Sequence, residues 1–347
     1  MLLTQESIDY TKTFPQHFDN TTLETFQTCP RKFELMMLNG LIPKHQARSL
    51  SFGAAVHLGL AVWYKTIGWD FDKLIAIFDE KTNIEYEKML EKLRTLNLDI
   101  SVELPETSLQ LRTELAIQYA LSELPPLHDT QLKEHRTHKL LEKILRLYFE
   151  FYRYESFKIV YVEQNFIFAL PNGKLYSGII DLVIEWFEKI LVMEHKTASN
   201  LFNFDEQFNP NQQITGYICG LHSLIDNASS LACLNAIQVS PRKEGPNEKD
   251  LARFPNIQRS EEQLQEFIVN CVDTITQMEE ALRRGYFSMT TKSCHQYSGC
   301  QFRPICKVSP GKERDIIINA FYVRKFWNPL TRDHLGEKDA KLEVETN

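Results

Sequence analysis

Short apolar runs rich in β-branched residues fill the middle of the chain, and helical spacing dominates on either side of them. Such runs predict the strands of a buried sheet. They cover residues 161–170, 178–187, 190–193 and 233–239. Residues 209–225, between the third and fourth runs, have the spacing of a helix. The pattern therefore predicts three strands, a helix and a fourth strand, in that order.

The N-terminal part of the chain predicts two helices. Thr21 and Glu24 have the spacing of a capping box, which indicates a helix start. Pro30 suits the first position of a fresh helical turn, and Gly40 suits the stop. A second helix is predicted over residues 51–63, where small residues permit close packing.

The remaining elements follow from caps and composition. Ser260 and Gln263 form another capping box, which predicts a long helix to about residue 284. Residues 241–259 read as a polar loop or short hairpin, and residues 1–19 as a tail or edge segment. This combination of a short sheet and flanking helices predicts an α/β architecture.

Residues 65–158 differ from the rest, because they hold charged, helix-favouring segments and no catalytic motif. These segments are 73–96, 105–124 and 138–154. We predict an inserted helical subdomain, most simply a structural cap, with a single-strand channel or a partner surface as alternatives. The predicted organisation is N-terminal helices (1–64), helical subdomain (65–158), α/β core (159–290) and C-terminal segment (291–347).

Charged residues interrupt the predicted strands where a core strand should have none. Asp181 lies inside the second run, and Glu194 and Lys196 close the third. Because a strand alternates faces, Glu194 and Lys196 point one way and His195 points the other. Burying two carboxylates and an ammonium together is costly unless they neutralise one another or hold a cation.

The composition, with 43% hydrophobic and 24% charged residues, is that of an ordinary globular protein. No apolar run is long enough to span a membrane and the start lacks a signal pattern, so we expect a cytoplasmic protein without a membrane partner. The net charge of −7 weighs mildly against non-specific DNA binding. Lys and Arg nevertheless outnumber acids over residues 283–325, which suits either a phosphate backbone or a solvated surface.

The arrangement of Asp181, Glu194 and Lys196 resembles the core of the PD-(D/E)XK nuclease superfamily. The resemblance implies that the two carboxylates hold a divalent metal and that Lys196 orients water or stabilises the transition state. It also implies a short mixed sheet flanked by helices, in the element order predicted above. The plain alternative is two amphipathic strands with an ordinary Asp–Lys pair.

Two helical motifs resemble the RecB-like branch of that superfamily. Gly53 and His57 match a Gly-x-x-x-His pattern, which implies that His57 joins the metal shell. Gln213 and Tyr217 match a Gln-x-x-x-Tyr pattern, which implies a role in orienting the substrate or holding the lysine. The same resemblance implies that the backbone carbonyl of His195 completes the shell.

Carboxylate and imidazole ligands indicate Mg²⁺ or Mn²⁺ as the metal, with the imidazole favouring Mn²⁺. Glu163, on the first predicted strand, is a candidate ligand for a second metal. The sequence shows no nucleophilic Ser or Cys triad and no glycine loop for phosphate, which argues against covalent hydrolase or nucleotidase chemistry.

The chain has 7 cysteines, and they form two groups. Cysteines within apolar elements look like buried thiols, namely Cys219, Cys233 and Cys271. Cysteines in an irregular segment after the core, together with one cysteine before it, suggest a metal or cluster site. These are Cys294, Cys300 and Cys306, with Cys29.

This second group resembles the iron–sulfur branch of RecB-like nucleases, as in the AddB nuclease domain and in CRISPR-associated and phage relatives. The resemblance implies a 4Fe–4S cluster held by all four thiolates, although four cysteines suit zinc equally well. The spacing departs from the Cys-x-x-Cys start of several members. We expect the group to act as a structural staple between the two ends of the chain.

Together these features predict a metal-dependent DNA exonuclease of recombination, repair or phage DNA processing. The alternatives are a structure-specific or restriction-type endonuclease, and a non-catalytic DNA-binding scaffold with a zinc site. The resemblance implies DNA as partner, with a recombinase, annealing protein or helicase and a homo-oligomer as further expectations.

Overall fold

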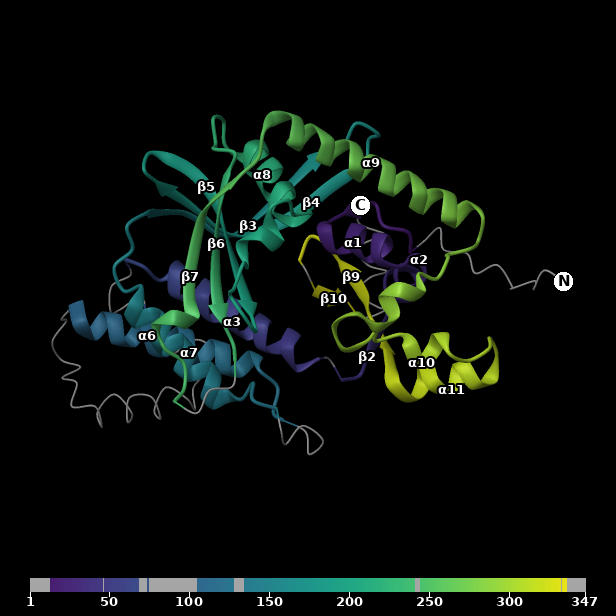
Figure 1. Cartoon of the computed structure of the whole chain (residues 1–347), viewed down its shortest axis with the longest axis horizontal. Helices are drawn as coiled ribbons and strands as arrows, with labels where there is room; N and C mark the ends of the chain where they lie inside the picture. Colours follow the sequence, from purple (N-terminus) through teal and green to yellow (C-terminus); the bar gives the residue numbers. More distant parts are fainter. Residues whose placement is uncertain are drawn as a thin grey trace.

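A six-stranded mixed sheet with helices on both faces forms the centre of the protein, seen here in a computed structural model (Figure 1). The structure describes residues 13–45, 47–68, 74, 105–127, 134–240, 244–331 and 333–335. The strands of the sheet are β1 (His17–Phe18), β3 (Lys158–Ala169), β4 (Leu175–Trp186), β5 (Lys189–Ala198), β6 (Leu231–Gln238) and β7 (Leu251–Gln258).

The helices lie before, between and after these strands. They are α1 (Asn20–Thr28), α2 (Pro30–Phe33), α3 (Arg48–Lys65), α6 (Pro105–Glu123), α7 (His138–Phe151), α8 (Gln212–Leu224), α9 (Glu261–Arg283), α10 (Arg303–Cys306) and α11 (Lys312–Phe321). The described part of the chain also has two small strand pairs. They join β2 (Leu41–Pro43) to β8 (Tyr322–Arg324) and β9 (Phe326–Asn328) to β10 (Asp333–Leu335).

The sheet is mixed because its central strands are connected in two ways. β4 and β5 form an antiparallel hairpin whose turn, Phe187 and Glu188, has positive φ at both positions. β5 and β6 are parallel, with α8 between them in the chain. β3 pairs antiparallel with β4, and β7 pairs antiparallel with β6. The predicted α/β class and the predicted order of these elements are confirmed.

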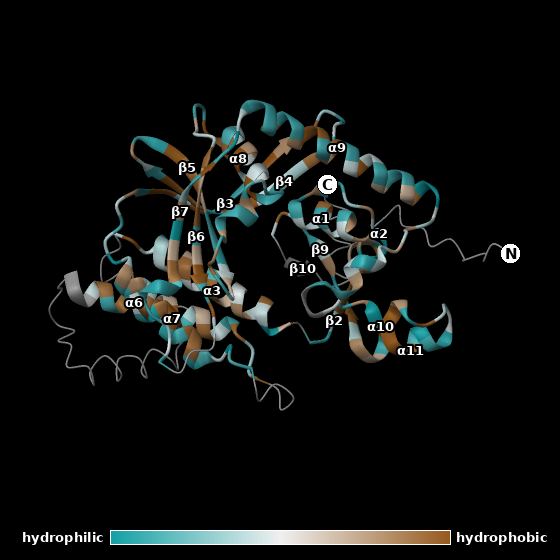
Figure 2. Ribbon diagram, viewed as in Figure 1, coloured by the Kyte–Doolittle hydropathy of each residue, from teal (hydrophilic) through white to brown (hydrophobic). Residues whose placement is uncertain are grey.

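Two apolar cores cover the two faces of the sheet, because successive side chains of a strand point to opposite sides. Val192 of β5 packs in the core that contains α1, α8 and α9. Its neighbours Leu191 and Met193 pack in the core that contains α3, α6 and α7. In Figure 2, hydrophobic residues lie along the central strands, while α9 is coloured mostly as polar.

The predicted capping box at Thr21 and Glu24 is wrong, because a better cap precedes it. The side chain of Asp19 accepts hydrogen bonds from the backbone N–H of Thr22 at 2.8 Å and from its hydroxyl at 2.5 Å. A carboxylate at this position also suits the positive end of the helix. Trp327 holds the second oxygen of Asp19 at 3.0 Å, which ties α1 to the C-terminal strand β9.

The interpretation of residues 241–259 as a loop or short hairpin is wrong in its second half, which forms the edge strand β7. Two residues made this strand difficult to predict from the sequence pattern. Pro255 is tolerated there because the strand lies at an edge. Arg253 is a charged residue at an inward position, and only the fold shows that Glu155 neutralises it.

The predicted helical subdomain contributes α6 and α7, while the predicted helix over residues 73–96 lies outside the described residues, apart from residue 74. α6 packs along α3, and α7 contacts both. Side chains of α3, α6 and α7 enter one core with the sheet. These helices therefore cover one face of the sheet directly.

The N-terminal and C-terminal parts of the described chain meet beside the sheet. β2 pairs with β8, and the backbone N–H of Arg31 donates to the carbonyl of Ser288 at 2.9 Å. A small separate core lies between them, built on Leu35, Leu41 and Phe302. None of the described helices has the length and apolar content needed to cross a membrane.

Candidate active site

Two buried carboxylates lie on neighbouring central strands of the sheet. Asp181 belongs to β4 and Glu194 to β5, and each is only 1% exposed. Lys196, two residues after Glu194 on the same face of β5, is 23% exposed and reaches solvent. The structure thus brings the three predicted residues together, as the hairpin register requires.

Asp181 is held by groups from a strand and from a helix. Its Oδ2 accepts the backbone N–H of His195 at 2.9 Å and lies 3.3 Å from Nδ1 of His57. His57 comes from α3, and Gly53 of the same helix lies beside Thr197 of β5. A Cβ at Gly53 would stand 3.4 Å from the hydroxyl of Thr197. The predicted helix motif therefore places an imidazole on the carboxylate.

A chain of polar contacts leads from Glu194 into α8. The ammonium of Lys196 donates to Oε1 of Glu194 at 2.5 Å and to Oε1 of Gln213 at 2.8 Å. The amide of Gln213 in turn donates to the hydroxyl of Tyr217 at 2.9 Å. Tyr217 is buried, so it fixes the amide of Gln213, and Gln213 presents its oxygen to the lysine.

Tight packing sets the position of α8 against the sheet. A Cβ at Gly220 would stand 2.5 Å from the ring of Phe166, and a Cβ at Gly216 would stand 2.5 Å from the hydroxyl of Tyr176. Both aromatic residues are buried, so neither ring has room to move. Glycine at these two positions lets the helix approach closely enough for Gln213 to reach Lys196.

The two histidines beside Asp181 have opposite electrostatic environments. Burial alone would lower the pKa of His57, but the charge and the hydrogen bond of Asp181 raise it above its ordinary value. Burial lowers the pKa of His195 to about 3, against the opposing charge of Asp181. His195 is therefore neutral at physiological pH, while His57 is biased toward the imidazolium form.

The predicted metal shell is not preassembled. The described residues contain no group of three or more His, Cys, Asp or Glu side chains arranged to hold a metal ion. The physical reason lies in the contacts above, since Glu194 turns toward Lys196 and Asp181 toward a backbone N–H. The donor set itself, two carboxylates and an imidazole, suits Mg²⁺ or Mn²⁺.

Glu163 lies across from Asp181 in the register of the sheet. Val162 pairs with Leu182 and Gln164 with Ile180, which leaves Glu163 facing Asp181 between them. Its φ of 50° is in the left-handed region, which is uncommon for a residue with a side chain. A part in a second metal site stays a prediction.

The segment before α10 runs against the start of α2, where Cys29 lies. The sulfur of Cys29 accepts the backbone N–H of Thr290 at 3.4 Å and lies 4.0 Å from the carbonyl of Ser288. The backbone N–H of Cys300 donates to the carbonyl of Cys294 at 3.0 Å. The fold thus carries the first cysteine of the chain to the C-terminal cysteine segment.

The pKa of Cys306 depends on the other three predicted cluster cysteines. Burial raises the pKa of the Cys306 thiol, and the guanidinium of Arg31 opposes this. The other three thiols raise it further, which requires them to lie near Cys306, and these are Cys300, Cys29 and Cys294. The four are neighbours without being arranged as ligands of one ion.

A set of polar residues that the sequence pattern did not predict lies on the other side of His195. Arg253 forms an ion pair with Glu155 at 2.7 Å, and both side chains are largely buried. Asn235, on β6, contacts the His195 ring at 2.8 Å. The available signal was an arginine within the alternating segment 251–257, a charge at a position that should face the core.

A mixed sheet with helices on both faces, carrying an aspartate on one strand and Glu-x-Lys on the next, defines a nuclease-type α/β core. The chain belongs to the PD-(D/E)XK nuclease superfamily, whose sequence profile matches residues 20–307. This match covers most of the chain and includes every predicted site residue.

Other comparisons add little. No curated protein matches the chain. Among solved structures, one similar chain is described as "Crystal structure of SSO0001", at 16% identity and a TM-score of 0.23. The similarity covers 34% of this chain and 50% of that chain, so it carries no argument about function.

Proposed function

We propose that this protein is a metal-dependent DNA exonuclease that hydrolyses phosphodiester bonds. Membership of the nuclease superfamily supports the reaction class. The observation that carries the proposal is the meeting of the buried carboxylates of Asp181 and Glu194 with the ammonium of Lys196 on paired strands. Such a buried charge group is costly to keep and is typical of a functional site.

Each residue of the site has a proposed task. Asp181, Glu194 and His57 would hold Mg²⁺ or Mn²⁺, with the backbone carbonyl of His195. The bound cation would lower the pKa of a water molecule and offset the charge of the phosphate. Lys196 would position that water and stabilise the developing anion.

The contacts of α8 support a positioning role for its two polar residues. Gln213 holds the ammonium of Lys196 through its carbonyl oxygen, and Tyr217 holds the amide of Gln213. The lysine is thereby kept beside Glu194 before substrate arrives, which reduces the reorganisation needed in the reaction. Gln213, which is only partly buried, is the one placed to meet a phosphate or a base.

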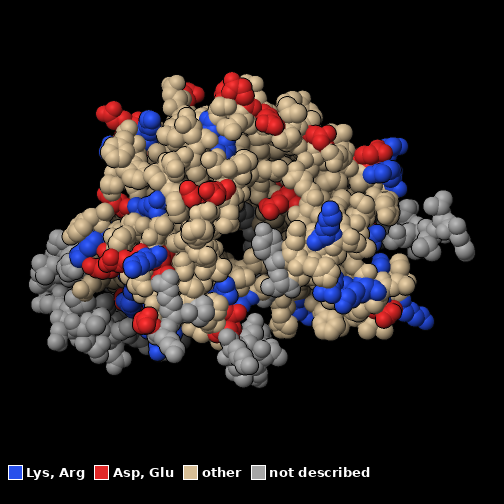
Figure 3. Space-filling model, in the orientation of Figure 1, with Lys and Arg blue, Asp and Glu red and all other residues tan. Residues whose placement is uncertain are grey.

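The charge of the surface supports an approach of DNA from the C-terminal side. In Figure 3, Lys and Arg side chains gather on the side of the molecule that holds α10 and α11, while acidic side chains lie over α9. Phosphate attraction to such a basic surface is independent of sequence. We propose that α6 and α7 of the helical subdomain cap the opposite side. We also propose that the enzyme serves recombination, repair or phage DNA processing.

Degradation of end-labelled linear DNA with Mg²⁺ or Mn²⁺ tests this function, with a covalently closed circle of the same sequence as control. We expect loss of the linear substrate, an intact circle and no reaction in the presence of a chelator. Cutting of the circle would indicate an endonuclease. A protein that shifts DNA in a gel but cleaves neither form would indicate a scaffold.

We also propose that the four neighbouring cysteines hold a 4Fe–4S cluster, with a Zn²⁺ ion as the alternative occupant of the site. Support comes from the contact of Cys29 with the segment that leads to the C-terminal cysteines, and from the effect of the other three thiols on the pKa of Cys306. These residues would then staple the two ends of the chain beside the sheet. Broad absorbance in the visible region of anaerobically purified protein is expected, and a colourless protein with bound zinc would contradict the cluster.

Cysteine variants test the staple separately from the reaction. Cys300→Ala should lower the free energy of unfolding by about 3 kcal/mol or more, as loss of a native crosslink does. Cys271→Ala, at a buried thiol within α9, is the matched control and should cost about 1 kcal/mol, as most point mutations do. Chemical denaturation measures both, and equal losses would contradict a special role for Cys300.

A further inference from the structure

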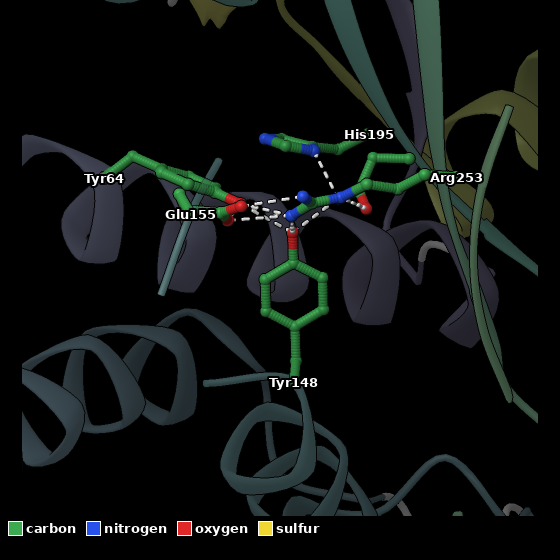
Figure 4. Close-up of polar contacts among 6 residues, drawn as sticks. Tyr64, Tyr148, Glu155, His195 and Arg253 are labelled. Carbon is green, nitrogen blue, oxygen red and sulfur yellow. Dashed lines mark hydrogen bonds and ion pairs between the residues drawn. The ribbon is translucent and has the colours of Figure 1, made fainter. Parts of the chain in front are cut away.

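A closed polar cluster lies behind the active site, on the face of β5 that carries His195. We call it the Arg253 cluster, and Figure 4 shows most of its contacts. Its members come from α3, α7, the segment after α7, β6 and β7, and they are Tyr64, Tyr148, Glu155, Asn235 and Arg253. It therefore joins the helical subdomain to the sheet at the level of the candidate active site.

The guanidinium of Arg253 is the centre of the cluster. Its two terminal nitrogens each donate to one oxygen of Glu155 at 2.7 Å. The same group reaches the hydroxyl groups of Tyr64 at 3.1 Å and Tyr148 at 3.2 Å. Its flat face lies 3.6 Å from the ring centre of Tyr152. A guanidinium that is paired and stacked in this way has a fixed orientation.

The orientation of Arg253 determines that of Asn235. Nε of Arg253 donates to the amide oxygen of Asn235 at 3.3 Å. The amide nitrogen of Asn235 must then face the other way, toward Tyr148 at 2.8 Å and Nδ1 of His195 at 2.8 Å. Because that nitrogen donates, Nδ1 of His195 accepts, and the ring carries its hydrogen on Nε2.

The His195 ring connects this cluster to the carboxylate site. Tyr64 stacks on it, with ring centres 5.6 Å apart and planes 7° from parallel. His57 meets it edge-on, at 6.1 Å and 73°. Tyr64 and His57 both belong to α3, so the ring touches this helix at two points. The main-chain N–H of the same histidine donates to Asp181.

We propose that Arg253 is a positioning residue for the candidate active site. Through Asn235 and Tyr64 it fixes the His195 ring, and the ring fixes both the β5 main chain that binds Asp181 and the α3 helix that presents His57. The proposal rests on the nuclease function for its kinetic consequence, but its structural consequence can be measured without any reaction.

Stability alone does not explain this arrangement. A buried ion pair is often no more stabilising than apolar residues of the same volume. The chain also contains a second bidentate pair from α7, in which Arg146 binds Glu114 at 2.6 and 3.0 Å. That pair joins α7 to α6 and makes no contact with His195, so it provides a matched control for removal of an arginine fork.

The test compares Arg253→Lys and Asn235→Ala with Arg146→Lys in the full-length protein. Arg253→Lys keeps the charge but loses the two-pronged contact of the guanidinium with Glu155. Asn235→Ala leaves the Arg253–Glu155 ion pair in place, so it can still be measured if Arg253→Lys does not fold. One readout is kcat and KM for linear DNA. The other is the ring ¹⁵N NMR signals of His195 and His57 in histidine-labelled, metal-free protein.

We expect both test variants to lose about 10- to 100-fold in kcat, the range found for partners that orient metal ligands, with KM for DNA unchanged. We also expect the His195 and His57 signals to shift in both. Arg146→Lys should leave kcat and both signals at their wild-type values.

Three results would overturn the proposal: unchanged histidine signals in the test variants, shifted signals with unchanged kcat, or equal effects in Arg146→Lys. A wild-type protein that fails to cleave any DNA would instead contradict the nuclease function. In that case the histidine NMR spectra alone test the positioning proposal. Unchanged His195 and His57 signals in the test variants would still rule out positioning by Arg253.

Discussion

The two faces of strand β5 place polar side chains in different environments, one open to solvent and one fully buried. On one face, Glu194 and Lys196 form a short ion pair that reaches solvent through the partly exposed ammonium. On the other face, His195 is 2% exposed and meets the closed Arg253 cluster. The alternation of a strand lets adjacent residues meet two different environments.

The difference shows how a single strand can combine a solvent-accessible ion pair with a rigid support. The Lys196 face keeps charges that a ligand can reach, and buried charge makes such a site costly. The His195 face satisfies its polar groups internally, which makes it rigid. We therefore expect changes on the first face to affect activity more than stability.

The largest expected effect comes from the charged residues themselves. Asp181→Ala and Lys196→Ala should reduce cleavage by at least about 10³-fold, since the first removes a proposed metal ligand and the second removes the cation proposed to stabilise the developing anion. The thermal unfolding midpoint should stay close to that of the wild type. Assays of end-labelled DNA and a thermal melt measure the two effects.

Glu185→Gln is the matched control, because Glu185 lies on β4 and, among the described residues, forms its ion pair with the exposed Lys158. It should change neither activity nor stability measurably, as exposed ion pairs contribute little. A fully active Lys196→Ala protein would remove the distinction between the two faces.

A smaller effect is expected from the residue that holds the lysine. Gln213→Ala frees the ammonium from its contact at 2.8 Å without removing charge. We expect kcat to fall by about 10- to 100-fold, as for other partners that orient a catalytic group. Tyr217→Phe removes only the contact behind Gln213 and should show a weaker loss in the same assay. A stronger loss for Tyr217→Phe than for Gln213→Ala would contradict this order.

The smallest effect on the reaction should come through packing. Gly220→Ala places a Cβ against the buried ring of Phe166, so α8 must shift and Gln213 with it. Overpacking of this kind costs about 1–3 kcal/mol, which denaturant unfolding can measure. Gly53→Ala is the comparison, because its Cβ has ordinary contact distance to Thr197. It should be neutral or stabilising by up to about 1 kcal/mol, since alanine favours the helix.

Many of the strands and helices could be predicted from the local pattern of apolar and polar residues. The short runs predicted β3 to β6 and the helix between them, and the Ser260 and Gln263 capping box predicted the start of α9. These signals depend on residues near one another in the chain. Thr21 failed as a cap because Asp19, two residues earlier, binds the helix start more effectively.

The candidate site was predictable in part for the same reason. Asp181, Glu194 and Lys196 stand out because charges are rare in apolar strands. Their meeting follows from a hairpin, which is a local structure. Arg253 carried the same signal, a charge at an inward position of an alternating segment. Its partner could not be predicted, because Glu155 is far from it in the chain and meets it only when α7 packs on the sheet.

By itself, then, the sequence determined the strands, most helices and which carboxylates and lysine interrupt the apolar strands, because periodicity and misplaced charge are properties of short segments. The tertiary structure alone decided which partners these groups meet. It placed Gln213 on Lys196, Arg253 behind His195 and Cys29 beside the C-terminal cysteines. The reason is physical, since a buried polar group is stable only with partners that the folded chain brings from distant segments.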